Sequence, residues 1–204
     1  MTSIHNDLTL DIRSEDGSDT QYFQDDENAI CKVFDELASP KLFSQPLLTL
    51  TSQQSVSAIP SRTIALILAR TPNPPPLRLP LGWLDFVEIG IEAFHDQTPP
   101  IVTGVAEPAG LPGEPARLNS LVEIHTVGDW RITLKLQTAV QATIPEQRRT
   151  FAQLVNLPVL SFRLEEGGLG FINSGKITRV TIFPAIAGMT DVGLPANLLR
   201  CVRA

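Results

Sequence analysis

The sequence has little of what most metal and redox sites need. It contains two cysteines, Cys31 and Cys201, and three histidines, and they form no cluster. Structural zinc sites take closely spaced Cys and His ligands, so we expect no zinc site. No pattern for another metal or for a cofactor stands out either. The cysteine usage favours reduced thiols and a cytoplasmic location, or a place inside a virion.

Long apolar runs are also missing. The longest wholly apolar run is Ile64–Ala69, far short of the ~18 residues that a membrane-spanning helix needs. The first residues lack the positive and apolar regions of a secretory signal. We therefore expect no transmembrane segment, and peripheral contact with a membrane stays open.

Aromatic residues are scarce at 6%, so aliphatic side chains must supply most of the core. Apolar residues make up 43% of the 204 residues, which is enough for one sizeable domain. Proline is abundant, with 17 residues, and this favours short elements joined by stiff connections.

Basic residues are rare near the start of the chain. Residues 1–36 hold ten acidic residues against Arg13 and Lys32, while the rest of the chain is nearly neutral. We expect a disordered acidic arm over 1–24 that does not bind nucleic acid directly, followed by a single α+β domain over 25–204. Within the arm, Leu8, Leu10 and Ile12 alternate with polar residues and could add a strand to another subunit's sheet.

The order of elements predicts the fold class. We expect an antiparallel sheet of about five to seven strands with two or three helices packed on one face. Hydrophobic periodicity predicts helices over residues 26–38, 82–96 and 145–156, and strands over 46–53, 62–70, 121–127, 130–144 and within 159–183. The first strand pair is followed by a proline-rich connection over 71–80, and a long connection covers 97–120.

The stretch EIHTVGDWRIT, residues 123–133, has the residue types of an acid–base site. A three-residue loop over 127–129 pairs Ile124 with Ile132 and leaves Glu123 and His125 in water. A two-residue loop would bury both against aliphatic side chains, and an unpaired buried polar group costs about 1–3 kcal/mol. The first register is therefore favoured, with Asp129 in a left-handed conformation, and a hydrolase that uses His125 is the least favoured function.

The last third carries two more local signals. Thr143 and Glu146 match a capping box at the start of a helix whose inward residues are Phe151, Leu154 and Val155. The glycine-rich stretch 167–170 invites comparison with a phosphate loop, but no helix follows it, so a β-turn is the better interpretation. The segment 195–203 could close as one or two helical turns.

Three classes of function remain. The first is a non-enzymatic structural or assembly protein that acts through protein–protein contacts, as a homo-oligomer. The element order resembles that of matrix proteins of negative-strand RNA viruses, without a shared motif such as PPxY, and this implies a self-associating matrix- or coat-like subunit. The second class is a small-molecule-binding β-rich domain, and the third is the hydrolase. We expect no catalytic residues, and the candidate contact residues are Leu8, Leu10, Ile12, Pro74, Pro75, Pro76, Trp83 and Leu111.

Overall fold

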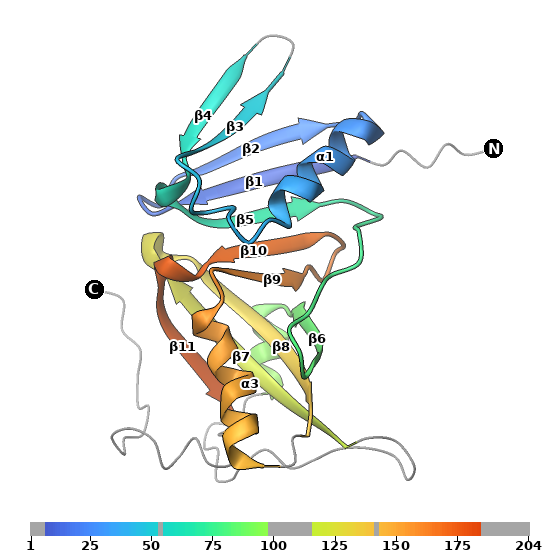
Figure 1. The fold of residues 1–204 in the computed structure, drawn as a ribbon, viewed down its shortest axis with the longest axis vertical. Coiled ribbons are helices and arrows are strands. Elements are labelled where there is room, and N and C mark those ends of the chain that lie inside the picture. Colours follow the sequence, from blue (N-terminus) through green and yellow to red (C-terminus); the bar gives the residue numbers. More distant parts are fainter. Residues whose placement is uncertain (1–6, 53–54, 98–115, 141–142, 185–204) are drawn as a thin grey trace, which may run out of the picture.

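A computed structural model describes residues 7–52, 55–97, 116–140 and 143–184 of the chain. These ranges form an α+β fold with one nine-stranded mixed sheet, a separate two-stranded hairpin and three α-helices (Figure 1). The elements in chain order are β1 (Leu8–Ser14), β2 (Asp19–Gln24), α1 (Glu27–Leu37), β3 (Leu47–Thr51), β4 (Val56–Pro60), β5 (Ile64–Arg70), β6 (Trp83–Glu88), α2 (Ile91–Gln97), β7 (Arg117–Thr126), β8 (Arg131–Ala139), α3 (Ile144–Asn156), β9 (Val159–Arg163), β10 (Leu169–Asn173) and β11 (Ile177–Phe183).

The large sheet has the strand order β11-β7-β8-β6-β9-β10-β5-β1-β2. Every neighbouring pair is antiparallel except β6 and β9, which run parallel and share only the pair Val87 and Arg163. A bidentate ion pair reinforces this short junction, because the Arg163 guanidinium donates to both carboxylate oxygens of Asp85 at 3.1 and 2.6 Å. The expected five to seven antiparallel strands are therefore wrong in number and in direction.

Two hydrophobic cores lie on opposite faces of this sheet. Alternate residues of β5 divide between them: Leu66 and Leu68 pack into the core under α3, and Ile67 and Ala69 into the core under α1. In Figure 1 both helices face the reader, because the accumulated twist of the sheet turns one face forward at α1 and the other at α3. The prediction that the helices share one face is wrong.

The β1–β2 turn and the β7–β8 turn approach each other at one end of the sheet. The Trp130 indole Nε1 donates to the Ser14 carbonyl oxygen at 2.9 Å, and Lys176 forms an ion pair with Glu15. Gly128 lies at φ +80°, and a Cβ there would be 2.6 Å from the Ser14 oxygen. Only glycine fits this close approach.

Several predicted elements are confirmed. Helix α1 begins after Asp26, whose carboxylate accepts from the Ala29 N–H at 2.7 Å. The capping box of α3 is present, since Thr143 and Glu146 bond each other's backbone N–H. Strand β5 is buried on both sides, residues 71–80 form neither helix nor strand, and the glycine-rich stretch turns between β9 and β10.

The β7–β8 hairpin has the predicted register. Ile124 pairs with Ile132, and the backbone N–H of Thr126 donates to the Trp130 carbonyl oxygen at 3.0 Å. Asp129 takes the left-handed conformation, with φ 62°. The apolar rows therefore meet across the two strands, which is the reason for expecting this register.

The disordered arm is wrong for the described residues. Residues 8–14 and 19–24 form β1 and β2, which extend the main sheet, so the domain does not begin at residue 25. The side chains of Leu8, Leu10 and Ile12 are buried in the chain's own core because their alternation matches the face covered by α1. Residues 1–6 lie outside the described residues.

Three other element predictions are wrong. Residues 82–96 are the strand β6 followed by the short helix α2, because a bulge between Trp83 and Asp85 hides the strand alternation. Strand β8 ends at Ala139 instead of continuing to 144. Val155 is exposed on α3 instead of facing inward. The expected turns over 195–203 and most of the 97–120 connection lie outside the described residues.

Candidate functional site

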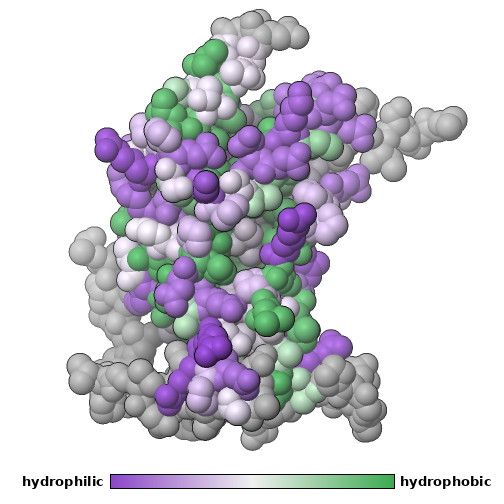
Figure 2. Space-filling view, in the orientation of Figure 1, coloured by the Kyte–Doolittle hydropathy of each residue, from purple (hydrophilic) through white to green (hydrophobic). Residues whose placement is uncertain are grey.

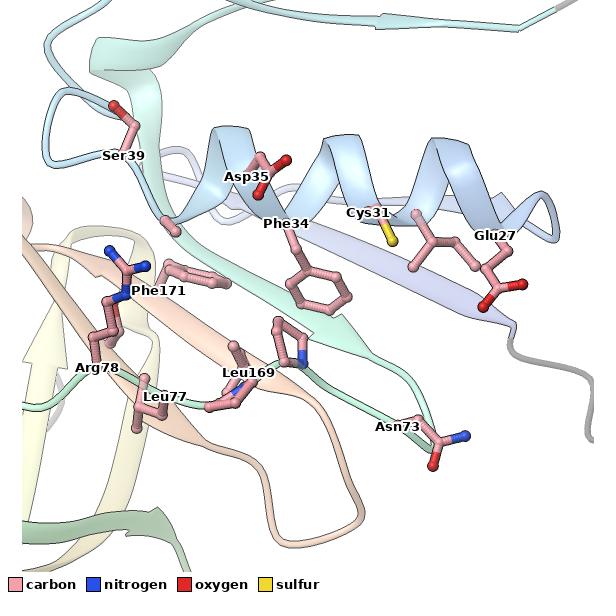
Figure 3. A pocket seen from close by; sticks show the side chains of 15 residues that line it. Glu27, Cys31, Phe34, Asp35, Ser39, Asn73, Leu77, Arg78, Leu169 and Phe171 are labelled. Carbon is pink, nitrogen blue, oxygen red and sulfur yellow. The ribbon is translucent and has the colours of Figure 1, made fainter.

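An open groove of about 890 Å³ lies between α1 and the proline-rich connection (Figure 3). One wall is α1, the other wall is residues 73–78, and strands β9 and β10 contribute the floor. The lining residues are Glu27, Ile30, Cys31, Phe34, Asp35, Ala38, Ser39, Asn73, Pro75, Pro76, Leu77, Arg78, Ser161, Leu169 and Phe171.

Local sequence explains both walls. The apolar stripe of α1 turns Ile30 and Phe34 toward the sheet, which places Cys31 and Asp35 on the flank of the helix, beside the groove. The opposite wall cannot join the sheet, because prolines donate no backbone N–H. The connection therefore runs alongside the sheet and leaves a gap between itself and the helix.

The floor of the groove is apolar and its rim is charged. Phe34, Leu169 and Phe171 are buried side chains at the bottom. Glu27 and Asp35 stand along the helix, and Arg78 stands on the opposite wall (Figure 3). Figure 2 shows mainly hydrophilic side chains over α1. The groove can therefore accept an apolar group, and it offers a positive charge two carboxylates on the helical wall, while Arg78 makes the opposite wall less favourable for one.

The predicted contact residues are split between groove and core. Pro75 and Pro76 are exposed in the groove wall, and Pro74 beside them is half-buried. Trp83 is buried, and its indole Nε1 donates to the Thr150 carbonyl oxygen at 3.1 Å, so it holds α3 against the sheet. Leu8, Leu10 and Ile12 are core residues, and Leu111 lies outside the described residues.

Sequence patterns did not predict most of the groove residues. The acidic residues of α1 look solvated on a helical wheel, which separates inside from outside but does not identify a flank that faces a second wall. Leu169 and Phe171 look like ordinary strand residues. Only the prolines gave a usable signal, since their incompatibility with regular structure is visible locally.

A second polar cluster surrounds Glu123 on the sheet face opposite α3. The expectation that Glu123 and His125 face water is wrong: the Glu123 side chain keeps 9% of its exposure and the His125 side chain 25%. Arg131 on β8 forms an ion pair with one carboxylate oxygen, and Arg179 on β11 lies 3.6 Å from the other. A buried carboxylate that faces two guanidiniums is a compensated structural group.

His125 belongs to the same cluster. Its ring nitrogen Nε2 lies 2.6 Å from the Arg179 guanidinium and 3.3 Å from a Glu123 oxygen. An arginine can only donate, so a hydrogen bond between Arg179 and this ring needs Nε2 as its acceptor. Within the described ranges, no hydroxyl or thiol is hydrogen-bonded to the ring.

One carboxylate elsewhere has a perturbed pKa. Burial raises the pKa of Glu88 above its ordinary value, while a backbone hydrogen bond from Glu165 and the charges of Arg70 and Arg13 act in the opposite direction. Glu88 is half-buried at the end of β6. Desolvation is the largest of these effects, so burial penalises the ionised form relative to that of an exposed glutamate.

The described residues contain no group of three His, Cys, Asp or Glu side chains placed to hold a metal ion. Among the helices that the structure describes, none is both long and apolar enough to cross a membrane. Comparisons of the chain with models of protein families, with curated proteins and with solved structures each gave no match.

Proposed function

We propose that this protein is a non-enzymatic assembly subunit whose groove binds an apolar, basic segment of a partner protein. The observation that carries the proposal is the combination in one groove of an apolar floor with the carboxylates of Glu27 and Asp35. Assembly by self-association, as a matrix- or coat-like subunit, is the form of this function that we favour.

The dimensions of the groove suit a short peptide segment. Helix α1 has 11 residues, so the helical wall is ~16 Å long. An extended chain rises ~3.3 Å per residue, so about five residues fit along the wall. Peptide grooves commonly take apolar anchors from the partner and use charges at the rim to select among sequences.

A display library of random short peptides would test this proposal. We expect enrichment of sequences that combine aliphatic residues with Arg or Lys. The variant Glu27→Lys/Asp35→Lys should lose this enrichment, and Asp25→Lys/Glu36→Lys is the matched control, because it reverses two exposed acids outside the groove lining. Absence of any enriched class, or the same class on both variants, would contradict the proposal.

Light scattering during size-exclusion chromatography addresses the self-association. We expect the mass to rise with protein concentration in the wild type and in the control variant. A monomeric mass at every concentration would contradict assembly by this chain alone.

A small-molecule ligand is the second candidate, favoured by the volume of the groove. About 890 Å³ lies within the ~300–1,000 Å³ of typical ligand pockets. A thermal-shift panel of apolar cations would reveal it as a ligand-dependent rise in Tm.

A further inference from the structure

We propose that residues 198–203 of this chain, Leu-Leu-Arg-Cys-Val-Arg, fold back and occupy the groove of the same molecule. The proposal concerns the regulation of the site described above, because a bound segment of the chain itself competes with a partner. It rests on the groove's chemistry, and it holds whether or not the protein assembles.

Charge singles out this segment among the parts of the chain outside the described residues. The stretch 98–115 carries Glu107 and Glu114 and has no Lys or Arg. The stretches 1–6, 53–54 and 141–142 also lack both residues. In 198–203, three aliphatic residues stand beside two arginines. It is therefore the segment that matches an apolar floor beside carboxylates.

The two kinds of contact have different roles. Exposed ion pairs contribute only ~0.2–1 kcal/mol each, so Arg200 and Arg203 facing Glu27 and Asp35 mainly select the occupant. Most of the affinity must come from apolar contact with the lining that is still accessible, Pro75, Pro76 and Leu77, because the floor side chains are already buried.

The last described strand, β11, ends in register with the groove floor. Phe183, at the end of β11, belongs to one row of paired residues that crosses the sheet to the groove floor. Directly paired residues project from the same face, so the Phe183 side chain lies on the face where the groove lies. The row runs Phe183, Leu121, Lys135, Val87, Arg163, Leu169.

The length of the connection fits this span. The row crosses five strand intervals, which is ~24 Å at the usual strand spacing. Leu198 is 14 residues beyond Pro184, and 14 residues can span at most ~46–50 Å. The connection is therefore long enough for the span, and a tethered segment that can reach its site binds within one molecule at high effective concentration.

The two cysteines supply a direct probe. Cys31 is an exposed thiol in the groove wall (Figure 3), and Cys201 is inside the proposed occupant. These are the only cysteines of the sequence. A disulfide forms when the two Cα atoms come within ~4.4–6.8 Å, so its rate of formation under mild oxidation reports how often the segment is in the groove.

The experiment oxidises the dilute full-length chain with diamide and follows the product by non-reducing electrophoresis and peptide mass mapping. We expect an intrachain Cys31–Cys201 disulfide that forms faster in the native protein than in urea. Glu27→Lys/Asp35→Lys should slow its formation on the order of tenfold, while Asp25→Lys/Glu36→Lys should leave the rate unchanged. A native rate no higher than the rate in urea overturns the proposal, as does a dimer as the only product.

A second measurement avoids the cysteines. Hydrogen exchange of α1 and of residues 73 and 77–79, the positions of the other wall that have a backbone N–H, should accelerate in the variant Leu198→Asp/Leu199→Asp. Unchanged exchange at both walls overturns the proposal. The same variant separates this inference from the proposed function, because a peptide selected for the groove should bind it more tightly than it binds the wild type. If the peptide binds the variant and the wild type equally well, the groove still has the proposed function, but residues 198–203 do not occupy it.

Discussion

Replacing Glu123 by alanine should reduce the free energy of unfolding by about 2–3 kcal/mol. Removing one partner of a fully buried ion pair costs ~3–5 kcal/mol, and an exposed pair is worth ~0.2–1 kcal/mol. The Glu123 side chain is 9% exposed, while those of Arg131 and Arg179 are each 32% exposed. The estimate lies between the two limits because the guanidiniums regain some water but lose the charge between them.

Urea denaturation gives the measurement, provided that the slope m stays at its wild-type value. The control is Glu166→Ala, an exposed glutamate on the β9–β10 turn, which should change stability by less than ~0.5 kcal/mol. A double-mutant cycle with Arg131→Ala should recover a coupling of about 1–2 kcal/mol. If Glu123→Ala matches the control, Glu123 is solvated as strand alternation suggests, and the buried cluster is refuted.

Three other changes test separate features of the fold. Gly128→Ala should lower the free energy of unfolding, measured by urea denaturation, by about 1–3 kcal/mol. The loss should exceed that of Gly17→Ala, because both glycines have positive φ but only a Cβ at residue 128 would strike the Ser14 oxygen. Equal losses would show that the close approach at Gly128 does not matter. Glu88→Gln should raise Tm at neutral pH, because the raised pKa of Glu88 makes the wild-type stability fall as the pH rises through that pKa. The gain in Tm should vanish below pH 4.5, the ordinary pKa of a glutamate, where Glu88 is protonated in both the folded and the unfolded state. A gain in Tm at every pH would contradict a titration effect. Arg163→Met should cost about 0.5–1 kcal/mol, and a wild-type unfolding curve would show that the ion pair across the parallel junction contributes nothing.

The hairpin shows how far local pattern can be used. The register of β7 and β8 follows from the apolar row, because a slip of one residue would bury charges against aliphatic side chains. The burial of Glu123 could not be predicted in the same way. It depends on Arg179, 54 residues beyond His125, and on the pairing of β11 with β7, which no local signal specifies.

The start of the chain shows composition and periodicity in conflict. Ten acids within residues 1–36 favour disorder, while alternation at Leu8, Leu10 and Ile12 favours a strand. In the structure the strand is formed because β5 and α1 offer a buried face for those three side chains. Asp11 is buried and forms an ion pair with Arg70, and the other acidic residues of this hairpin are exposed and cost little, so net charge alone does not decide against a strand.

The prediction of one helix over residues 82–96 was wrong for a different reason. A bulge beside Leu84 interrupts the alternation. Asp85, Glu88, Glu92 and Asp96 are then spaced three or four residues apart, as on one face of a helix, by coincidence. Gly90, immediately before α2, is the local sign that the segment has two parts. A glycine inside an apparent helix lowers helical stability by about 1 kcal/mol relative to alanine, which argues for a boundary there.

The groove and its proposed occupant differ in what a sequence can specify. The groove unites residues 27–39, 73–78 and 161–171, and these meet only because the sheet places β10 beside β5 and α1 above both. No local pattern can identify such a site. A short linear occupant, in contrast, carries its charge and apolar residues in consecutive positions. Once the structure shows a carboxylate-rimmed apolar groove, the search for a basic apolar segment returns to the sequence, and Leu198–Arg203 is the stretch with that composition among those outside the described residues.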